Sequence, residues 1–296
     1  MYEIIDLSFL GEESTIAVFA IPSSDGLILV ESGPHSTFPE LVRRLKGMGY
    51  EPSDVRHVLL SHIHFDHAGA AWCFAELGAN VYVHPAGAKH LAAPEKLYAS
   101  ASMIYGEQME KLWGAMKPIA EGRIVIPQHG ESIAIGEHHF TAWYTLGHAV
   151  HHIAWQLDKI LFTGDVGGVK INSGVVMPPC PPPDINIEDW QQSIALMRNL
   201  DISELVLTHY GRITAVDAHL QALEQELIAW ADWMKPQYLA GKKADEIIPE
   251  FEAFVAERLK NRGIMDADIP RYEKANPAFI SVAGLLRYWH KKTVLQ

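Results

Sequence analysis

Ser61–Gly69 reads S-H-I-H-F-D-H-A-G and carries three histidines and one aspartate. Imidazole nitrogen and carboxylate oxygen are ligands that zinc and similar divalent cations prefer. The residues just before it, V-R-H-V-L-L at 55–60, are mostly apolar and predict a buried strand. Loops at strand ends commonly carry chemistry, so the sequence predicts a metal site where this strand ends.

The spacing inside this stretch predicts how its side chains are arranged. In an extended segment alternate side chains share a face, so we expect His62, His64 and Asp66 to converge while His67 turns the other way. This geometry suits two neighbouring metal ions better than one. A single histidine among the 16 in this chain would usually satisfy a local hydrogen bond, but four ligand-type residues within six positions indicate metal binding.

The composition limits the classes of function. A chain of 296 residues that is 48% hydrophobic can bury one large core or two modest ones. Its formal net charge of -12 argues against a dedicated nucleic-acid binder. The two cysteines, Cys73 and Cys180, make no disulfide framework. Acidic residues near the N-terminus and the lack of a long apolar run predict a soluble, cytoplasmic protein.

Apolar runs separated by turn sequences and glycines predict an antiparallel opening, followed by strands and helices. The expected strands are 2–7, 15–21, 26–31, 55–60, 80–83, 123–126, 132–135, 139–146, 152–157, 159–163 and 204–208. The expected helices are 38–48, 68–77, 187–200, 216–235, 244–262 and 277–291. We expect the helices after residue 215 to pack on the core or to form a dimer surface, and closure of a substrate pocket is the alternative.

An insert at residues 86–119 interrupts the strands with bulky apolar side chains at helical spacing. One interpretation is an inserted helix that packs on the core. The alternative is a wall over the metal site, because methionine and aromatic side chains line adaptable apolar pockets. The side chains concerned are Met103, Tyr105, Met109, Trp113 and Met116.

Three further strands end in a histidine or an aspartate with a glycine nearby, at Gly147-His148, Gly164-Asp165 and His209-Tyr210-Gly211. Glycine lets the backbone turn tightly there, and four such endings indicate strands that meet at a common edge. Seven ligands are too many for one tetrahedral zinc but suit two cations that share a carboxylate. The candidate ligands are His62, His64, Asp66, His67, His148, Asp165 and His209.

The chain resembles the metallo-β-lactamase superfamily in its ordered motifs, which are His62-x-His64-x-Asp66-His67, Gly147-His148, Gly164-Asp165 and Thr208-His209. The resemblance implies an α/β fold, the four-layer αββα sandwich, with a dinuclear site at one edge. It also implies a catalytic domain over residues 1–214, which includes the insert, and a C-terminal helical extension over residues 215–296.

The same resemblance implies how the ligands divide between two metals. The first metal would be held by His62, His64 and His148, and the second by Asp66, His67 and His209, with Asp165 as the bridge. The carboxylates Asp66 and Asp165 are also taken as the catalytic groups. The expected cofactors are two divalent metal ions, with zinc preferred and iron or manganese as alternatives.

Two positions depart from the family pattern. Glu31-Ser32-Gly33 stands where many members have aspartate before the glycine, and Ala149 stands where many have serine. Neither position is expected to touch a ligand. His151 and His152, which follow shortly after His148, are interpreted as buried structural residues, and a proton donor for catalysis is the alternative.

The expected mechanism uses two cations about 3.5–4 Å apart that share a water and make hydroxide available at neutral pH. The superfamily includes thioesterases similar to glyoxalase II, lactonases, β-lactamases, nucleases and iron redox proteins, so the fold does not select the substrate. The apolar insert and the intact His64, where redox relatives carry glutamate, favour hydrolysis of a small, partly apolar carboxylic ester, thioester or lactone. The basic contacts typical of glyoxalase II are not evident after Asp165, where Lys170 is the one cation close by.

Two other functions stay open. A phosphodiesterase or nuclease would cleave bis-p-nitrophenyl phosphate rather than thioesters and lactones. An iron-dependent oxidation enzyme would contain iron rather than zinc. A non-catalytic metal-binding module is less favoured, because all seven ligands are present. The expected partner is a small-molecule substrate, without nucleic acid or membrane, and a homodimer is considered as well.

Overall fold

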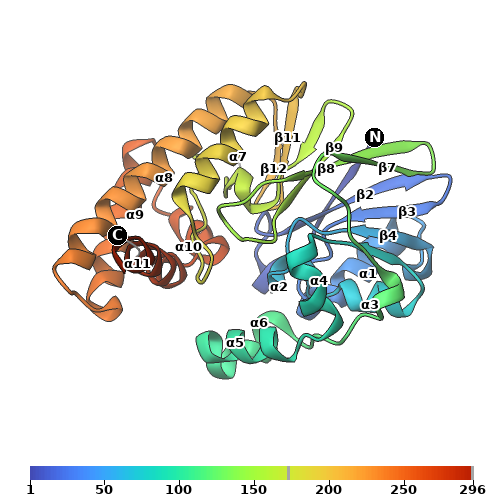
Figure 1. Cartoon of the computed structure of the whole chain (residues 1–296), viewed down its shortest axis with the longest axis horizontal. Coiled ribbons are helices and arrows are strands. Elements are labelled where there is room, and N and C mark those ends of the chain that lie inside the picture. The colour runs from blue at the N-terminus through green and yellow to red at the C-terminus, as the bar shows by residue number, and fades with distance from the viewer. Residues whose placement is uncertain (172–173, 295–296) are drawn as a thin grey trace.

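Two six-stranded β-sheets form the centre of the protein in the computed structural model, which describes residues 1–171 and 174–294 (Figure 1). The last two residues of the expected C-terminal extension lie outside this description. The first sheet contains β1 (Glu3–Asp6), β2 (Ala17–Ser23), β3 (Gly26–Val30), β4 (Val55–Leu59), β5 (Asn80–Tyr82) and β6 (Ile124–Val125). The second contains β7 (Glu131–Ile135), β8 (His138–Tyr144), β9 (Ile153–Leu157), β10 (Ile160–Phe162), β11 (Glu204–Leu207) and β12 (Gly211–Ile213).

The pairing of the strands follows the expected opening. Strands β1 to β3 pair antiparallel, and β4, β5 and β6 extend the sheet in parallel. In the second sheet β7 to β10 are antiparallel, β11 is parallel to β10, and β12 pairs antiparallel with β11. Strand β12 was not expected, because three residues are too few to show a period in the sequence.

The helices differ from expectation mainly in their number and in where they begin and end. The insert contains three helices rather than one, the helix expected at 68–77 is shorter and is preceded by a separate short helix, α2, and α10 was not expected. The helices are α1 (Phe38–Gly47), α2 (Phe65–Ala68), α3 (Ala71–Glu76), α4 (Pro85–Ala92), α5 (Glu95–Tyr105), α6 (Met109–Trp113), α7 (Ile187–Asn199), α8 (Val216–Leu239), α9 (Ala244–Asn261), α10 (Ile269–Ala275) and α11 (Ala278–Val294).

Side chains that alternate along β2 show how the layers pack. Phe19 and Ile21 lie in the core between the two sheets, where they meet Trp155 of the second sheet. Val18 and Ala20 lie in the core between the first sheet and its helices. The strand is buried on both faces, which explains why it reads as a continuous apolar run instead of an alternating one.

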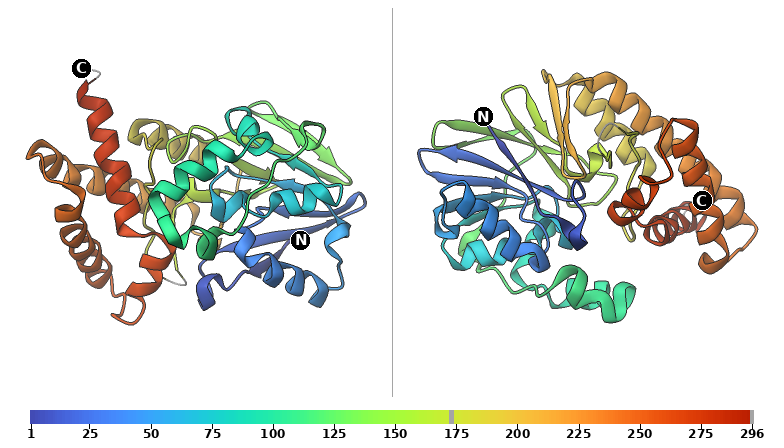
Figure 2. Two further views of the ribbon diagram at one scale, coloured as in Figure 1. Left: turned by 90° about the horizontal axis from the view of Figure 1, so that it is seen from below. Right: turned by 180° about the vertical axis from the view of Figure 1, so that it is seen from behind.

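Helices cover the outer face of each sheet (Figure 2). Leu41 of α1 and Phe74 of α3 belong to the core beneath the first sheet. Trp190 of α7 and Leu223 of α8 belong to the core outside the second sheet. The four-layer αββα fold expected from the sequence is therefore confirmed.

Helices α8, α9 and α11 form a lobe beside the second sheet, drawn in orange and red in Figure 1. Their core is continuous with that sheet, since Trp230 and Leu285 share one cluster of buried side chains with Leu205. Helix α11 also lies tightly against the proline-rich loop at 179–183, because a Cβ at Gly284 would come within 2.0 Å of the Cys180 carbonyl oxygen. Among the described residues, each helix is too short or too polar to cross a lipid bilayer.

Candidate metal centre

Four strands end at one edge of the sandwich, and the residues that follow them carry all seven candidate ligands. In the second sheet β8, β10 and β11 run in the same direction, because β8 and β10 both pair antiparallel with β9 and β11 pairs parallel with β10. Their ends therefore place His148, Asp165 and His209 together. Gly147 (φ 122°) and Gly164 (φ 50°) adopt the backbone conformation that favours glycine and allow the expected tight turns. Strand β4 of the first sheet supplies the other four ligands at the same edge.

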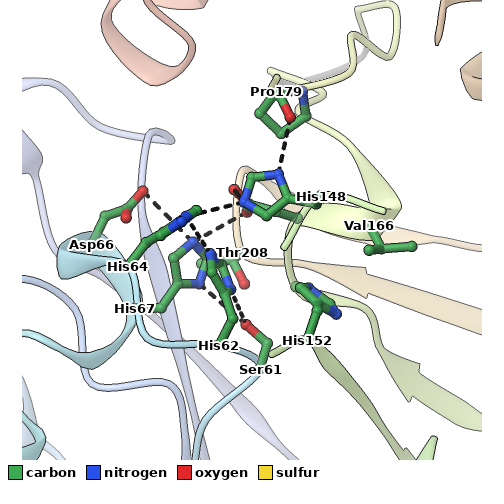
Figure 3. A network of polar contacts seen from close by, with 12 residues as sticks. Ser61, His62, His64, Asp66, His67, His148, His152, Val166, Pro179 and Thr208 are labelled. Carbon is green, nitrogen blue, oxygen red and sulfur yellow. Dashed lines mark hydrogen bonds and ion pairs between the residues drawn. The ribbon is translucent and has the colours of Figure 1, made fainter. Parts of the chain in front are cut away.

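One group of ligand atoms consists of His62, His64 and His148 (Figure 3). His64 Nδ1 lies 2.8 Å from His62 Nε2 and 3.1 Å from His148 Nε2. A neutral imidazole has one N–H and one lone pair, so three such nitrogens cannot satisfy one another fully. A cation between them would be met by all three lone pairs.

The second group consists of Asp66, His67, Asp165 and His209. His67 Nε2 and His209 Nε2 lie 3.1 Å and 3.3 Å from Asp165 Oδ1. The other oxygen of Asp165, Oδ2, lies 3.3 Å from His148 Nε2 of the first group. Asp165 therefore presents one oxygen to each group, which is the arrangement of a carboxylate shared by two cations.

The expected convergence of Asp66 with His62 and His64 is wrong, because Asp66 lies with His67. Phe65–Ala68 forms the short helix α2 instead of an extended segment, and successive side chains on a helix are about 100° apart. Asp66 and His67 consequently belong to one group, whereas His62 and His64 belong to the other. This division is the one that the family resemblance implied, not the one that strand geometry predicted.

Three of the histidines are held from outside the cluster by an acceptor on the outer ring nitrogen, Nδ1. An outer nitrogen that donates leaves the inner nitrogen with its lone pair for a metal, and it fixes the orientation of the ring. The contacts are His67 to Glu31 Oε1 at 2.9 Å, His148 to the Pro179 carbonyl oxygen at 2.9 Å, and His209 to the Thr15 carbonyl oxygen at 2.7 Å.

Glu31 was expected not to touch a ligand, and this expectation is wrong. Its buried carboxylate accepts from His67 Nδ1, from the Ser61 backbone N–H at 3.1 Å and from the Thr208 hydroxyl at 3.3 Å. The contact with His67 joins residues 36 positions apart, so no local pattern in the sequence reveals it. Glu31 is thus a positioning residue for the second group.

Replacement of Glu31 by glutamine tests this role. The three partners of Glu31 are all donors, and a glutamine amide offers one oxygen and an NH2 group that would face one of them. We expect Glu31→Gln to weaken metal binding about 10–100-fold, the usual effect of losing a partner that orients a ligand. Metal titration of the variant measures this, with Glu76→Gln on the surface as the control. Unchanged metal affinity would show that Glu31 does not orient His67.

Charge distinguishes the two groups. Burial and the neighbouring His148 lower the pKa of His64 to about 3, so this imidazole is neutral at neutral pH. Burial also acts to lower the pKa of His67, but the carboxylates of Asp165 and Asp66 outweigh it and raise that pKa well above the usual value. A proton in the second group thus occupies the place that a cation would take between the two anions.

The residues present fit divalent cations. His67 Nε2 and Asp165 Oδ1 are buried 3.1 Å apart without the geometry of a hydrogen bond, and neither has another hydrogen-bond partner among the described residues. Unpaired buried polar atoms are costly. The ligand atoms of each group all lie within 4.8 Å of one another. Imidazole and carboxylate ligands without thiolate are compatible with zinc, iron or manganese.

The cluster lies at the floor of a pocket of about 650 Å³. The walls come from four segments, which are the start of the chain, the insert, the proline-rich loop at 179–183 and the residues 274–280 that join α10 to α11. Exposed apolar side chains from four places stand at its edge: Leu10, Ile104, Val150 and Phe279. A separate hollow of about 510 Å³ near Tyr50 carries none of the candidate ligands.

The insert both packs on the core and forms a wall of this pocket. Trp113 and Tyr105 line the pocket, and Trp113 stacks on Phe9 with ring centroids 5.5 Å apart. Met103 is 83% exposed and lies outside the lining, and Met109 is buried beneath it. The C-terminal helices likewise pack on the core and also reach the pocket through Phe279.

The family described as the Metallo-beta-lactamase superfamily matches residues 11–209. Metallo-beta-lactamase fold-containing protein ST1585 from Sulfurisphaera tokodaii is 29% identical over 179 residues, which make up 58% of this chain and 68% of that protein.

Solved structures show the same fold. The metallo-beta-lactamase family protein TTHA1429 from Thermus thermophilus superposes with a TM-score of 0.68 at 20% identity, over 99% of this chain and 94% of that one. A B3 metallo-beta-lactamase with an active-site glutamic acid superposes with a TM-score of 0.56 at 20% identity, over 77% and 86%. At this level of identity the likeness concerns the fold alone.

Proposed function

Because this chain belongs to the metallo-β-lactamase superfamily, we propose that it is a hydrolase that depends on two divalent cations, with zinc preferred. Its proposed substrate is a small, partly apolar carboxylic ester, thioester or lactone. The proposal rests on the position of Asp165. Its two carboxylate oxygens face two separate groups of ligand atoms at the floor of an apolar pocket.

The proposed roles divide between the residues at the floor and those on the walls. His62, His64 and His148 would hold one cation, Asp66, His67 and His209 the other, and Asp165 both. When bound, such cations lower the pKa of water toward neutrality and polarise a carbonyl oxygen.

The side chains around the cluster support this chemistry. Glu31 keeps His67 in the required orientation, and the Pro179 carbonyl does the same for His148. Asp66 and Asp165 neutralise part of the positive charge. The apolar walls exclude bulk water and bind the apolar part of the substrate.

A substrate panel tests the proposed class of reaction. Purified protein with its metal content measured is assayed on a phenyl ester, an acyl thioester, an acyl lactone and bis-p-nitrophenyl phosphate. We expect turnover of at least one of the three carbonyl substrates and little of the phosphodiester. Turnover of the phosphodiester alone would contradict the proposal.

Trp113 is expected to bind substrate rather than to take part in the chemistry. Truncation of Trp113 to alanine removes apolar contact that is equal in the ground state and the transition state, so KM rises more than kcat falls. The loss should be about 1–3 kcal/mol for long acyl or aromatic substrates, with short substrates and metal content nearly unaffected.

The control for Trp113 is Met103→Ala on the same insert. Met103 is exposed and does not line the pocket, so its truncation should change neither parameter. If Trp113→Ala lowers the melting temperature but leaves the preference for long substrates intact, Trp113 supports the core and does not bind substrate.

A further inference from the structure

His151 lies between β8 and β9, three residues after His148, and lines the pocket without a hydrogen bond to any other residue that the structure describes. Its side chain is buried, with 7% of the residue exposed. Nδ1 is closed off from solvent and has no partner among the described residues. Nε2 also makes no hydrogen bond to a described residue, but unlike Nδ1 it remains accessible to solvent. It is therefore the ring nitrogen that is open to the pocket. His152 differs, because its Nδ1 lies 2.8 Å from the Thr145 hydroxyl and the residue is fully buried.

The ring of His151 lies beside the first group of ligands. The ring centroid of His151 is 5.7 Å from that of His64 and 6.1 Å from that of His62. The rings of His151 and His62 are nearly parallel. Helix α4 supports it from behind, because a Cβ at Gly87 would be 3.6 Å from the Cβ of His151. The side chain is therefore held at the edge of the floor of the pocket.

The surroundings determine where His151 carries its proton. Burial, together with His64 and His148, holds the pKa of His151 well below its usual value, so the ring is neutral and has one N–H. A proton on Nδ1 would be a buried donor without an acceptor, and such donors are rare. The N–H is consequently placed on Nε2, where the pocket can supply an acceptor.

Resting on the proposed hydrolase function, we propose that His151 is a substrate-binding residue whose Nε2–H donates a hydrogen bond to the carbonyl oxygen of the scissile ester, thioester or lactone. This oxygen gains negative charge when water adds to the carbonyl carbon and loses it when the leaving group departs. A fixed donor at that position binds more strongly in the transition state than in the ground state. His151 transfers no proton in this role.

Two substitutions separate the hydrogen bond from the bulk of the ring. His151→Phe keeps an aromatic ring and removes the N–H, and His151→Asn restores an N–H on a shorter side chain. We expect His151→Phe to lower kcat about 100-fold, as for other single donors to a developing oxyanion, with a much smaller rise in KM and with metal content little changed. His151→Asn should recover part of the loss. The apparent pKa values of the pH-rate profile should stay the same, because the donor does not titrate.

A binding measurement without turnover complements these rates. The metal-free protein is titrated with 2-decanone, which has a carbonyl oxygen and an apolar chain but no scissile bond. We expect His151→Phe to bind this ketone about three- to tenfold more weakly than the unsubstituted protein, in line with the loss of one hydrogen bond. His139→Phe, at an exposed position on β8, is the control and should match the unsubstituted protein in both assays.

The outcomes distinguish this inference from the proposed function. If the unsubstituted protein hydrolyses none of the carbonyl substrates, the proposed function fails, and the ketone titration still tests the hydrogen bond. If the unsubstituted protein hydrolyses them, and His151→Phe has the same kcat and the same ketone affinity as that protein, the inference about His151 fails while the proposed function stands. Loss of metal or of folding in His151→Phe, without recovery in His151→Asn, would assign His151 a structural role and also overturn it.

Discussion

Replacement of Asp165 by asparagine is expected to abolish hydrolysis and to remove metal from both groups. The side chain faces His67 and His209 with one oxygen and His148 with the other. An amide keeps the shape but loses the charge, and one of its two ends can no longer accept or coordinate. We expect kcat/KM to fall by at least about 10³-fold, beyond the 10–100-fold typical of residues that only orient ligands.

Metal content and activity are measured together for this variant. Asp201→Asn serves as the control, because this carboxylate is exposed at the surface and pairs with Lys159. Asp165→Asn protein with full metal content and normal rates would contradict the bridging role.

Removal of His209 is expected to separate the two groups. His209 lies 3.4 Å from Asp66 and 3.3 Å from Asp165, and its ligand atom belongs to the second group. His209→Ala should therefore keep about one metal ion per chain, held by the three histidines of the first group. Activity should fall at least about 100-fold, because the shared-cation arrangement is lost.

The control for His209 is His139→Ala at an exposed position on β8. Metal analysis and kcat/KM on the same preparation give the result. Two metals per chain and unchanged rates in His209→Ala would place His209 in the core of the protein instead of the metal centre.

The candidate ligands could be predicted from the sequence because each one lies in the loop or short helix that follows the end of a strand. An apolar run and a neighbouring glycine mark those ends locally at His148 and Asp165, and parallel strands bring their ends to one edge. The division of the ligands could not be predicted from strand geometry. A helix of four residues, such as α2, is too short to produce a period, so the change of direction at Asp66 and His67 is not visible in the sequence.

The surroundings of the site depend on contacts between distant parts of the chain. Glu31 reaches His67 from a neighbouring strand, and Phe279 reaches the pocket from the C-terminal lobe. His151 and His152 are adjacent and alike in sequence, yet one lines the pocket and the other is buried against Thr145. These differences arise from the packing of whole elements, which residue type and spacing do not specify.

The central claim is that this chain is a hydrolase with two metal ions that share Asp165. Elemental analysis of the purified protein, paired with hydrolysis of the carbonyl substrates before and after chelation, tests it most directly. We expect about two divalent ions per chain, loss of turnover when they are removed, and recovery when zinc is returned. One iron ion per chain, or full turnover in metal-free protein, would contradict it.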